Sequence, residues 1–206
     1  RFTKSCHAYG LRPGFCIDLT TQNSFGEYWD LSRKDHQEQF ERLQDKENPE
    51  LLTGSPPCRT FCKLLKIKLT DDQISQQQEL EGKPYVRTCI KAYWKQLAKG
   101  KHFLHEHPRD SDSWKMPEVE ELASDPRVFK VTGPMRRFEM RAVDNYGNEG
   151  FVRKETTYLT SSERLAQILE GKCLNQTGEG WHRHVHLIGG GRTQAAAGAD
   201  AAVGVR

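Results

Sequence analysis

The chain has 206 residues, enough for one domain of ordinary size or for a domain with a tail. Apolar residues make up 35% of it, below the roughly 45–50% usual in globular proteins, so we expect a small core. The formal net charge of +3 is too small to require a nucleic-acid partner on its own. No apolar run reaches the ~18 residues of a membrane span, which excludes an integral membrane helix.

The six cysteines are too sparse for a disulfide scaffold, so we expect reduced thiols and an intracellular protein, in the cytoplasm or the nucleus. The chain begins with arginine rather than methionine, and no signal-like apolar segment follows. We therefore expect an internal piece of a larger protein.

Hydrophobic periodicity predicts strands that alternate with helices. In chain order, the pattern predicts a strand at 14–19, a helix opened by a capping box at Ser32 and ended by Asn48, a strand at 51–54, a loop or frayed helix at 70–83, a helix at 85–99, a strand at 102–108, a helix at 117–124, strands at 128–140 and 150–158, and a helix from Ser161 or Ser162 to Leu169. The helix at 85–99 is the clearest, because its apolar residues recur at three- and four-residue steps.

This alternation predicts an α/β domain over residues 1–170, with a sheet that is largely parallel at first. Residues 171–188 form an extension that carries histidines and a cysteine. The segment 189–206 is rich in glycine and alanine, and we expect it to be disordered.

Three polar features follow predicted strands, where open α/β sheets bind their ligands. They are Asp18, the Pro-Pro-Cys turn that ends at Cys58, and Glu106. Two prolines stiffen the backbone before Cys58, as a positioned nucleophile requires, and a carboxyl group from a neighbouring strand end can bind a substrate or transfer a proton. The alternatives are an inert turn cysteine, a strand-end cap for Asp18, and an exposed acid for Glu106.

The segment Leu-Thr-Gly-Ser-Pro-Pro-Cys-Arg-Thr-Phe at 52–61 resembles the Pro-Cys loop of DNA cytosine-5 methyltransferases. The resemblance implies that Cys58 matches the cysteine that attacks cytosine and that Glu106 contacts the base. It implies S-adenosylmethionine as cofactor, with Asp18 at its ribose and Asp30 near its adenine. The fold it implies is a Rossmann-like three-layer sandwich of the S-adenosylmethionine-methyltransferase kind. Because the family's glycine-rich cofactor loop is absent before Asp18, we expect this fold to be incomplete at the N-terminus.

A second resemblance covers more of the chain. The order of the Ser-Pro-Pro-Cys turn, Phe-Leu-His-Glu-His-Pro, Ser-Trp-Lys, Cys173 and the later histidines is similar to a methyltransferase-like module in polyproteins of copia-type retroelements. This resemblance implies neighbouring polyprotein domains as partners, and it implies no specific enzymatic activity.

The C-terminal extension carries a possible zinc site. His182, His184 and His186 alternate, so in a strand all three share one face. Together with Cys173 they form a set of imidazole and thiolate groups that suits zinc. Plain exposed histidines are the alternative.

Two basic runs flank the expected site and suit contact with phosphate, which makes nucleic acid, DNA or RNA, an expected partner. The residues expected to contact nucleic acid are Arg59, Lys63, Arg87, Lys91 and Lys95. The alternative is a solvated helix face.

From these features we expect a methyltransferase-derived accessory module of a retroelement-type polyprotein, associated with nucleic acid and not catalytic alone. Two alternatives stay open. One is an active cytosine-5 methyltransferase whose cofactor loop lies upstream of residue 1. The other is a zinc-stabilised nucleic-acid-binding module.

Overall fold

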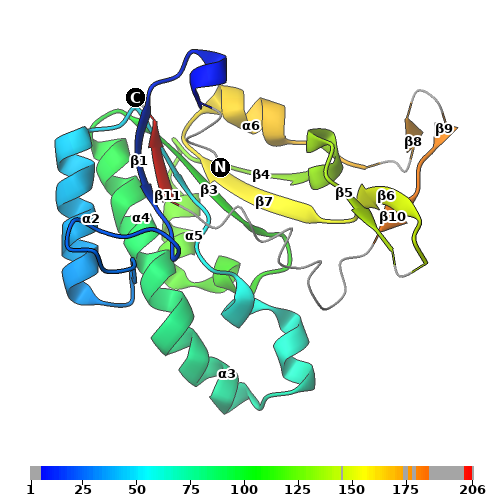
Figure 1. Cartoon of the computed structure of the whole chain (residues 1–206), viewed down its shortest axis with the longest axis horizontal. Helices are drawn as coiled ribbons and strands as arrows, with labels where there is room; N and C mark the ends of the chain where they lie inside the picture. The colour runs from blue at the N-terminus through cyan, green and yellow to red at the C-terminus, as the bar shows by residue number, and fades with distance from the viewer. Residues whose placement is uncertain (1–5, 145, 174–175, 178–179, 186–201, 206) are drawn as a thin grey trace.

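The computed structural model of the chain describes residues 6–144, 146–173, 176–177, 180–185 and 202–205. They form a mixed α/β protein with a six-stranded sheet, covered by helices, and a separate three-stranded sheet (Figure 1). The α/β class expected from the sequence is confirmed. Among the described residues, no helix has the length and apolar character needed to cross a bilayer.

The six-stranded sheet has the strand order β1-β11-β2-β3-β7-β4. The strands are, in that order, β1 (Pro13–Ile17), β11 (Ala202–Val205), β2 (Leu51–Gly54), β3 (His102–Pro108), β7 (Glu155–Thr160) and β4 (Phe129–Pro134). Only β2 and β3 are parallel neighbours, because β11 and β7 each run against the strands on both sides. The sheet is therefore mixed rather than largely parallel.

Strand β11 lies in the segment for which the sequence predicts disorder. Ala202–Val205 pairs with β1 on one side and β2 on the other, and so joins two strands that do not otherwise pair. Hydrogen bonds to β11 thus satisfy the backbone N–H and C=O groups on the facing edges of β1 and β2. A prediction from local composition does not take such pairing into account. The remainder of the expected tail, 189–201 and 206, lies outside the described residues.

Helices α2 (Lys34–Glu47), α4 (Lys83–Ala98) and α5 (Pro117–Ala123) cover one face of the sheet, and α6 (Glu163–Leu169) lies on the other face over β4 and β7 (Figure 1). The predicted apolar stripe of α4 faces the sheet, and Tyr93 stacks on Phe103 of β3 with ring centroids 4.6 Å apart. Gly54 permits this approach, because a Cβ at that position would lie 2.1 Å from the Tyr93 hydroxyl.

The segment 70–83, expected as a loop or frayed helix, is helical. It forms α3 (Asp71–Gln77) and one π-helical turn, η4 (Gln78–Gly82), which leads directly into α4. Thr70 and Gln73 form the capping box that opens α3. The capping box expected at Ser32 is not formed, because the Ser32 hydroxyl donates to Asp30 and α2 begins without a side-chain cap.

Short 3-10 turns connect several elements. They are η1 (His7–Tyr9), η2 (Arg59–Phe61), η3 (Lys63–Ile67), η5 (Asp112–Lys115) and η6 (Met135–Phe138). Turn η6 ends the strand expected at 128–140, and a break at 153–154 divides the strand expected at 150–158 between β6 and β7.

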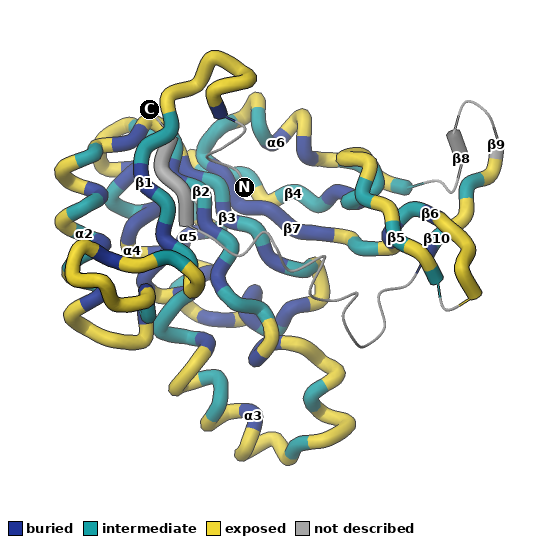
Figure 2. The backbone as a smooth tube through the Cα atoms, viewed as in Figure 1, coloured by how far each residue is buried: buried dark blue, intermediate teal, exposed yellow. Residues whose placement is uncertain are grey.

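The small sheet has the order β10-β6-β5 and comprises β5 (Arg141–Val143), β6 (Glu149–Val152) and β10 (His184–Val185). The strands β8 (Gln176–Thr177) and β9 (Gly180–Trp181) pair beside it. The main sheet and α4 are largely buried, whereas most of the small sheet is half-buried or exposed (Figure 2). Val152 and Val185 are the large buried side chains among its described residues, so apolar burial alone gives this sheet little stability.

Candidate functional site

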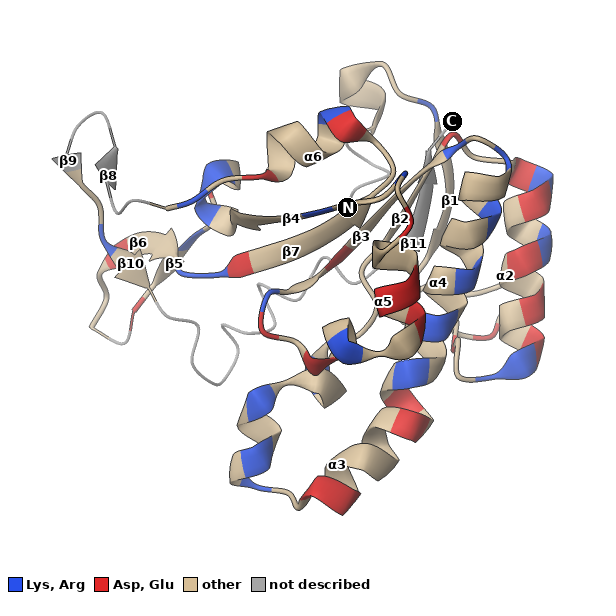
Figure 3. Cartoon of the chain, turned by 180° about the vertical axis from the view of Figure 1, so that it is seen from behind, with Lys and Arg blue, Asp and Glu red and all other residues tan. Residues whose placement is uncertain are grey.

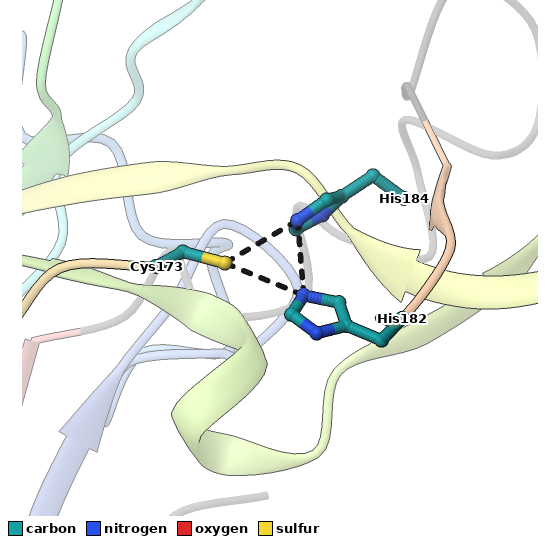
Figure 4. Close-up of side chains that lie close together, drawn as sticks. All are labelled: Cys173, His182 and His184. Carbon is teal, nitrogen blue, oxygen red and sulfur yellow. Dashed lines mark hydrogen bonds between the residues drawn. The ribbon is translucent and has the colours of Figure 1, made fainter. Parts of the chain in front are cut away.

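Cys173, His182 and His184 converge at one point beside the small sheet (Figure 4). Cys173 follows α6, and the two histidines alternate along the chain that enters β10, so their rings lie on the same side. The Cys173 Sγ lies 3.3 Å from Nε2 of His182 and 3.3 Å from Nε2 of His184, and the two nitrogens are 3.0 Å apart. Three of the four residues expected to bind zinc are therefore together; His186 lies outside the described residues.

Hydrogen bonds alone do not satisfy the three atoms of this cluster well. A ring nitrogen of imidazole has a single site in the ring plane, which holds either a proton or a lone pair. Each Nε2 can therefore make one well-directed hydrogen bond, whereas each faces two partners here. A cation at the centre of the group would receive a lone pair from all three atoms at once.

The separations also match tetrahedral zinc. Bonds of ~2.3 Å to sulfur and ~2.0–2.1 Å to nitrogen place the ligand atoms about 3.5 Å apart for a sulfur–nitrogen pair and about 3.3 Å for a nitrogen pair. The observed distances of 3.3, 3.3 and 3.0 Å are within a few tenths of these edges. One thiolate and two imidazoles are ligand types that zinc prefers.

The surroundings keep both imidazoles in the neutral form that binds metal ions. Burial and then the charge of Arg136 lower the pKa of His182. Burial lowers the pKa of His184 as well, with contributions from His182 and from the charges of Arg153 and Arg136. The edge of the Phe151 ring packs against His182, with centroids 5.3 Å apart. Zinc therefore does not have to displace a proton from either ring near neutral pH.

Glu27, Asp35 and His36 form a second group of possible metal ligands. Arg33 lies between the two carboxylates and donates hydrogen bonds to both. Because a guanidinium already neutralises the acids, this group is an ion-pair cluster rather than a metal centre.

A cavity of about 30 Å³ lies at the carboxyl ends of β1 and β2. Asp18 lines it together with Pro56 and Pro57 of the Pro-Pro-Cys turn, and Trp29 and Tyr85 contribute aromatic walls. Its position is the one at which open α/β sheets bind ligands. The volume accommodates one or two water molecules, so a larger ligand would have to displace side chains.

The two acids expected to bind a cofactor take part in local turns. Asp18 accepts hydrogen bonds from the backbone and the hydroxyl of Thr20. Asp30 lies outside the cavity lining and accepts hydrogen bonds from Ser32 and from the Tyr85 hydroxyl. Burial opposes ionisation of Asp30, but these hydrogen bonds outweigh it and lower the pKa of its carboxyl group. The contact from Tyr85 spans 55 residues and had no signal in the sequence.

Cys58 and Glu106, the expected catalytic pair, do not share the cavity. Cys58 precedes η2 beyond the two prolines, and neither residue lines the space beside Asp18. Along β3, the side chains of His105 and His107 are buried on the α4 face, and the strand alternation turns Glu106 to the other face. There the carboxylate of Glu106 lies 3.7 Å from the Lys154 ammonium.

His107 holds the Pro-Pro-Cys turn in place, a contact that the sequence did not predict. Its Nε2 lies 2.9 Å from the carbonyl oxygen of Pro56, and its Nδ1 contacts the Ser113 hydroxyl at 2.5 Å. A carbonyl only accepts, so Nε2 carries the proton, and Nδ1 of the neutral ring accepts from Ser113. The Ser111 hydroxyl, 2.9 Å from that of Ser113, continues this chain of hydrogen bonds.

Three of the basic residues expected to contact nucleic acid lie on α4, and each of these has an acidic partner on a neighbouring helical segment. Lys91 pairs with Glu41 and Lys95 with Asp45, both on α2. In Figure 3, α2 carries red stretches of ribbon and the neighbouring helix α4 carries blue ones. Arg87 pairs with Glu118 and Glu79, and Arg59 lies 3.5 Å from Glu81, whereas Lys63 is exposed on η3. The basic residues of α4 therefore form ion pairs with acids on neighbouring helical segments.

All six cysteines lie within the described residues, and no disulfide joins any two of them there. No protein-family model, no curated protein and no solved structure matches this chain.

Proposed function

We propose that this protein is a zinc-stabilised binding module, in which a centre formed by Cys173, His182 and His184 organises the small sheet. The observation that carries the proposal is the mutual approach of the three ligand atoms, at 3.0 to 3.3 Å, in an arrangement that protons satisfy poorly. The ion would link the segment after α6 to the strand β10. The small sheet has little apolar core of its own, so the metal supplies the cohesion that burial does not.

The test is metal content and spectroscopy of the purified protein. We expect about one zinc ion per chain, and we expect replacement by Co²⁺ to give the intense sulfur-to-metal absorption of a cobalt thiolate. Cys173→Ser should remove that absorption, whereas Cys62→Ser, at an exposed cysteine on another part of the chain, should leave it unchanged. A protein that takes up no Zn²⁺ or Co²⁺ would contradict the proposal.

The second candidate is a methyltransferase-derived accessory module of a retroelement-type polyprotein, with the Rossmann-like sandwich of that family. The cavity beside Asp18 favours it, because it lies next to the Pro-Pro-Cys turn at the carboxyl ends of two strands that run in the same direction. The separation of Cys58 from this cavity favours a module that is not catalytic alone.

Calorimetric titration with S-adenosylmethionine distinguishes the forms of this second candidate. We expect no heat of binding, because the cavity of about 30 Å³ is far smaller than the nucleoside portion of that molecule. Binding with micromolar affinity would instead show that the walls open and would favour a working methyltransferase. In that case Asp18→Ala should weaken the affinity, since it removes the acid at the ribose position.

A further inference from the structure

Two arginines lie beside the metal-ligand cluster. The backbone N–H of Met135 donates to the carbonyl oxygen of Lys154 at 2.9 Å, and the backbone N–H of Arg153 donates to the carbonyl oxygen of Val185 at 2.9 Å. These two hydrogen bonds bring the η6 turn, with Arg136, next to Arg153, and bring Arg153 next to the strand that carries His184. The η6 turn passes beside the cluster in Figure 4.

Arg136 and Arg153 differ from the other arginines of this region. Arg141 contacts Glu139 and Glu149, Arg183 pairs with Asp144, and Arg137 donates to the carbonyl oxygen of Glu170. Neither Arg136 nor Arg153 forms an ion pair with any acid among the residues that the structure describes. The Nε atom of Arg136 is also enclosed, and no described group accepts its hydrogen bond.

An enclosed guanidinium N–H without an acceptor is unfavourable, so a native structure normally supplies an acceptor. Two cationic side chains favour an anion, and a zinc ion with one thiolate would add a further positive charge. The planar guanidinium group matches the tetrahedral oxygens of phosphate, which accept two parallel hydrogen bonds from it.

We infer that Arg136 and Arg153 form a binding site for a phosphate group beside the metal-ligand cluster. The Arg136 side chain turns so that its enclosed Nε reaches and donates to one phosphate oxygen, and Arg153 neutralises the remaining charge. The phosphate can be a free ion or part of a polynucleotide backbone, since both present the same oxygens. The site goes beyond the proposed zinc centre and uses none of its ligands.

The first experiment is thermal unfolding of the purified protein in increasing inorganic phosphate, with chloride added to hold the ionic strength constant. We expect the unfolding midpoint to rise with phosphate in the wild type. In Arg136→Gln the apparent affinity should fall roughly tenfold or more, as loss of a charge-assisted hydrogen bond predicts. Arg137→Gln is the matched control, because Arg137 lies on the same turn and contacts a backbone carbonyl instead. No stabilisation of the wild type, or equal stabilisation of Arg136→Gln, would overturn the inference.

A second measurement identifies the source of the phosphate. A fluorescent single-stranded oligonucleotide is followed by anisotropy, with inorganic phosphate as competitor. Binding that weakens in both Arg136→Gln and Arg153→Gln and is displaced by phosphate supports a polynucleotide ligand at this site. Phosphate stabilisation without oligonucleotide binding supports a free phosphate ion. Arg136→Lys, which retains the charge and removes the planar fork, keeps the test valid if the glutamine variant does not fold.

The zinc content of every sample is measured alongside. Protein that takes up no added zinc and still binds phosphate through Arg136 would contradict the zinc proposal and support the phosphate site. Metal-loaded protein that does not respond to phosphate would do the reverse.

Discussion

Removal of zinc by a chelator should lower the thermal unfolding midpoint by about 5–10 °C, relative to protein in the presence of free zinc at about one hundred times its dissociation constant. Ligand binding at that excess stabilises the native state by ~2.7 kcal/mol, and each kcal/mol shifts the midpoint of a domain of this size by about 2–4 °C. Cys173→Ser and His184→Ala should abolish the difference between chelator and zinc, because each removes a ligand of the centre.

Cys62→Ser serves as control, since this exposed cysteine lies outside the cluster and its loss should leave the zinc response intact. The chain has four tryptophans, so the part of the fluorescence that is lost in Trp181→Phe, at a side chain that is 77% exposed and precedes His182, reports on the same region separately from global unfolding. We expect its signal to change on metal removal before the main sheet unfolds. Equal unfolding midpoints in zinc and in chelator would exclude a structural metal at this site.

Elements with a one-sided apolar pattern were predictable from the sequence. The predicted strands at 51–54 and 102–108 have the bounds of β2 and β3, and the predicted helix at 85–99 is α4 within two residues at its start and one at its end. In each case, the residues that face the core recur every three or four positions in a helix, or every two positions in a strand. That pattern is local, so it survives without knowledge of the tertiary fold.

Elements stabilised by caps or by distant pairing were harder to predict. Helix α3 buries Ile74 alone and so has no apolar stripe, although the Thr70 and Gln73 capping box was present in the sequence as a signal. Strand β11 exists through its pairing with β1 and β2, which lie about 150 residues or more away along the chain. Local composition carries no information on such a partner.

The candidate site divides in the same way. The alternation of His182 and His184 places both rings on one side, and this much follows from strand geometry. Cys173 lies only nine residues before His182 and eleven before His184, so the sequence could also group it with them. By contrast, the contact of His107 with the Pro56 carbonyl spans 51 residues, so no motif marks it.

Acidification from pH 7 to pH 4 should lower the free energy of unfolding by about 3 kcal/mol through His107 alone. Burial lowers the pKa of His107 to about 4, against an ordinary value near 6.5 in the unfolded chain, and the contact with Pro56 offsets this only in part. Between these two values the unfolded chain binds a proton that the folded chain does not bind. Stability is therefore complete above about pH 6.5 and is lost as the pH falls towards 4.

The direct neighbour His105 acts in the same direction, since burial and the charge of His107 lower its pKa well below the ordinary value. Protonation would also place a second N–H of His107 against the Ser113 hydroxyl, which donates to that nitrogen in the neutral ring. Urea unfolding at pH 7, 6, 5 and 4 measures the dependence. His107→Gln keeps a donor for the Pro56 carbonyl but cannot titrate, so its stability should fall less steeply with acid.

His102→Gln, at the exposed start of the same strand, is the matched control and should retain the wild-type slope. Because Pro56 belongs to the turn that carries Cys58, the rate at which a thiol reagent modifies Cys58 in native protein reports whether this turn loosens locally before global unfolding. We expect His107→Ala, which leaves both the Pro56 carbonyl and Ser113 without their partner, to raise that rate at pH 7. A His107→Gln variant with the same acid sensitivity as wild type would show that other groups carry the pH dependence.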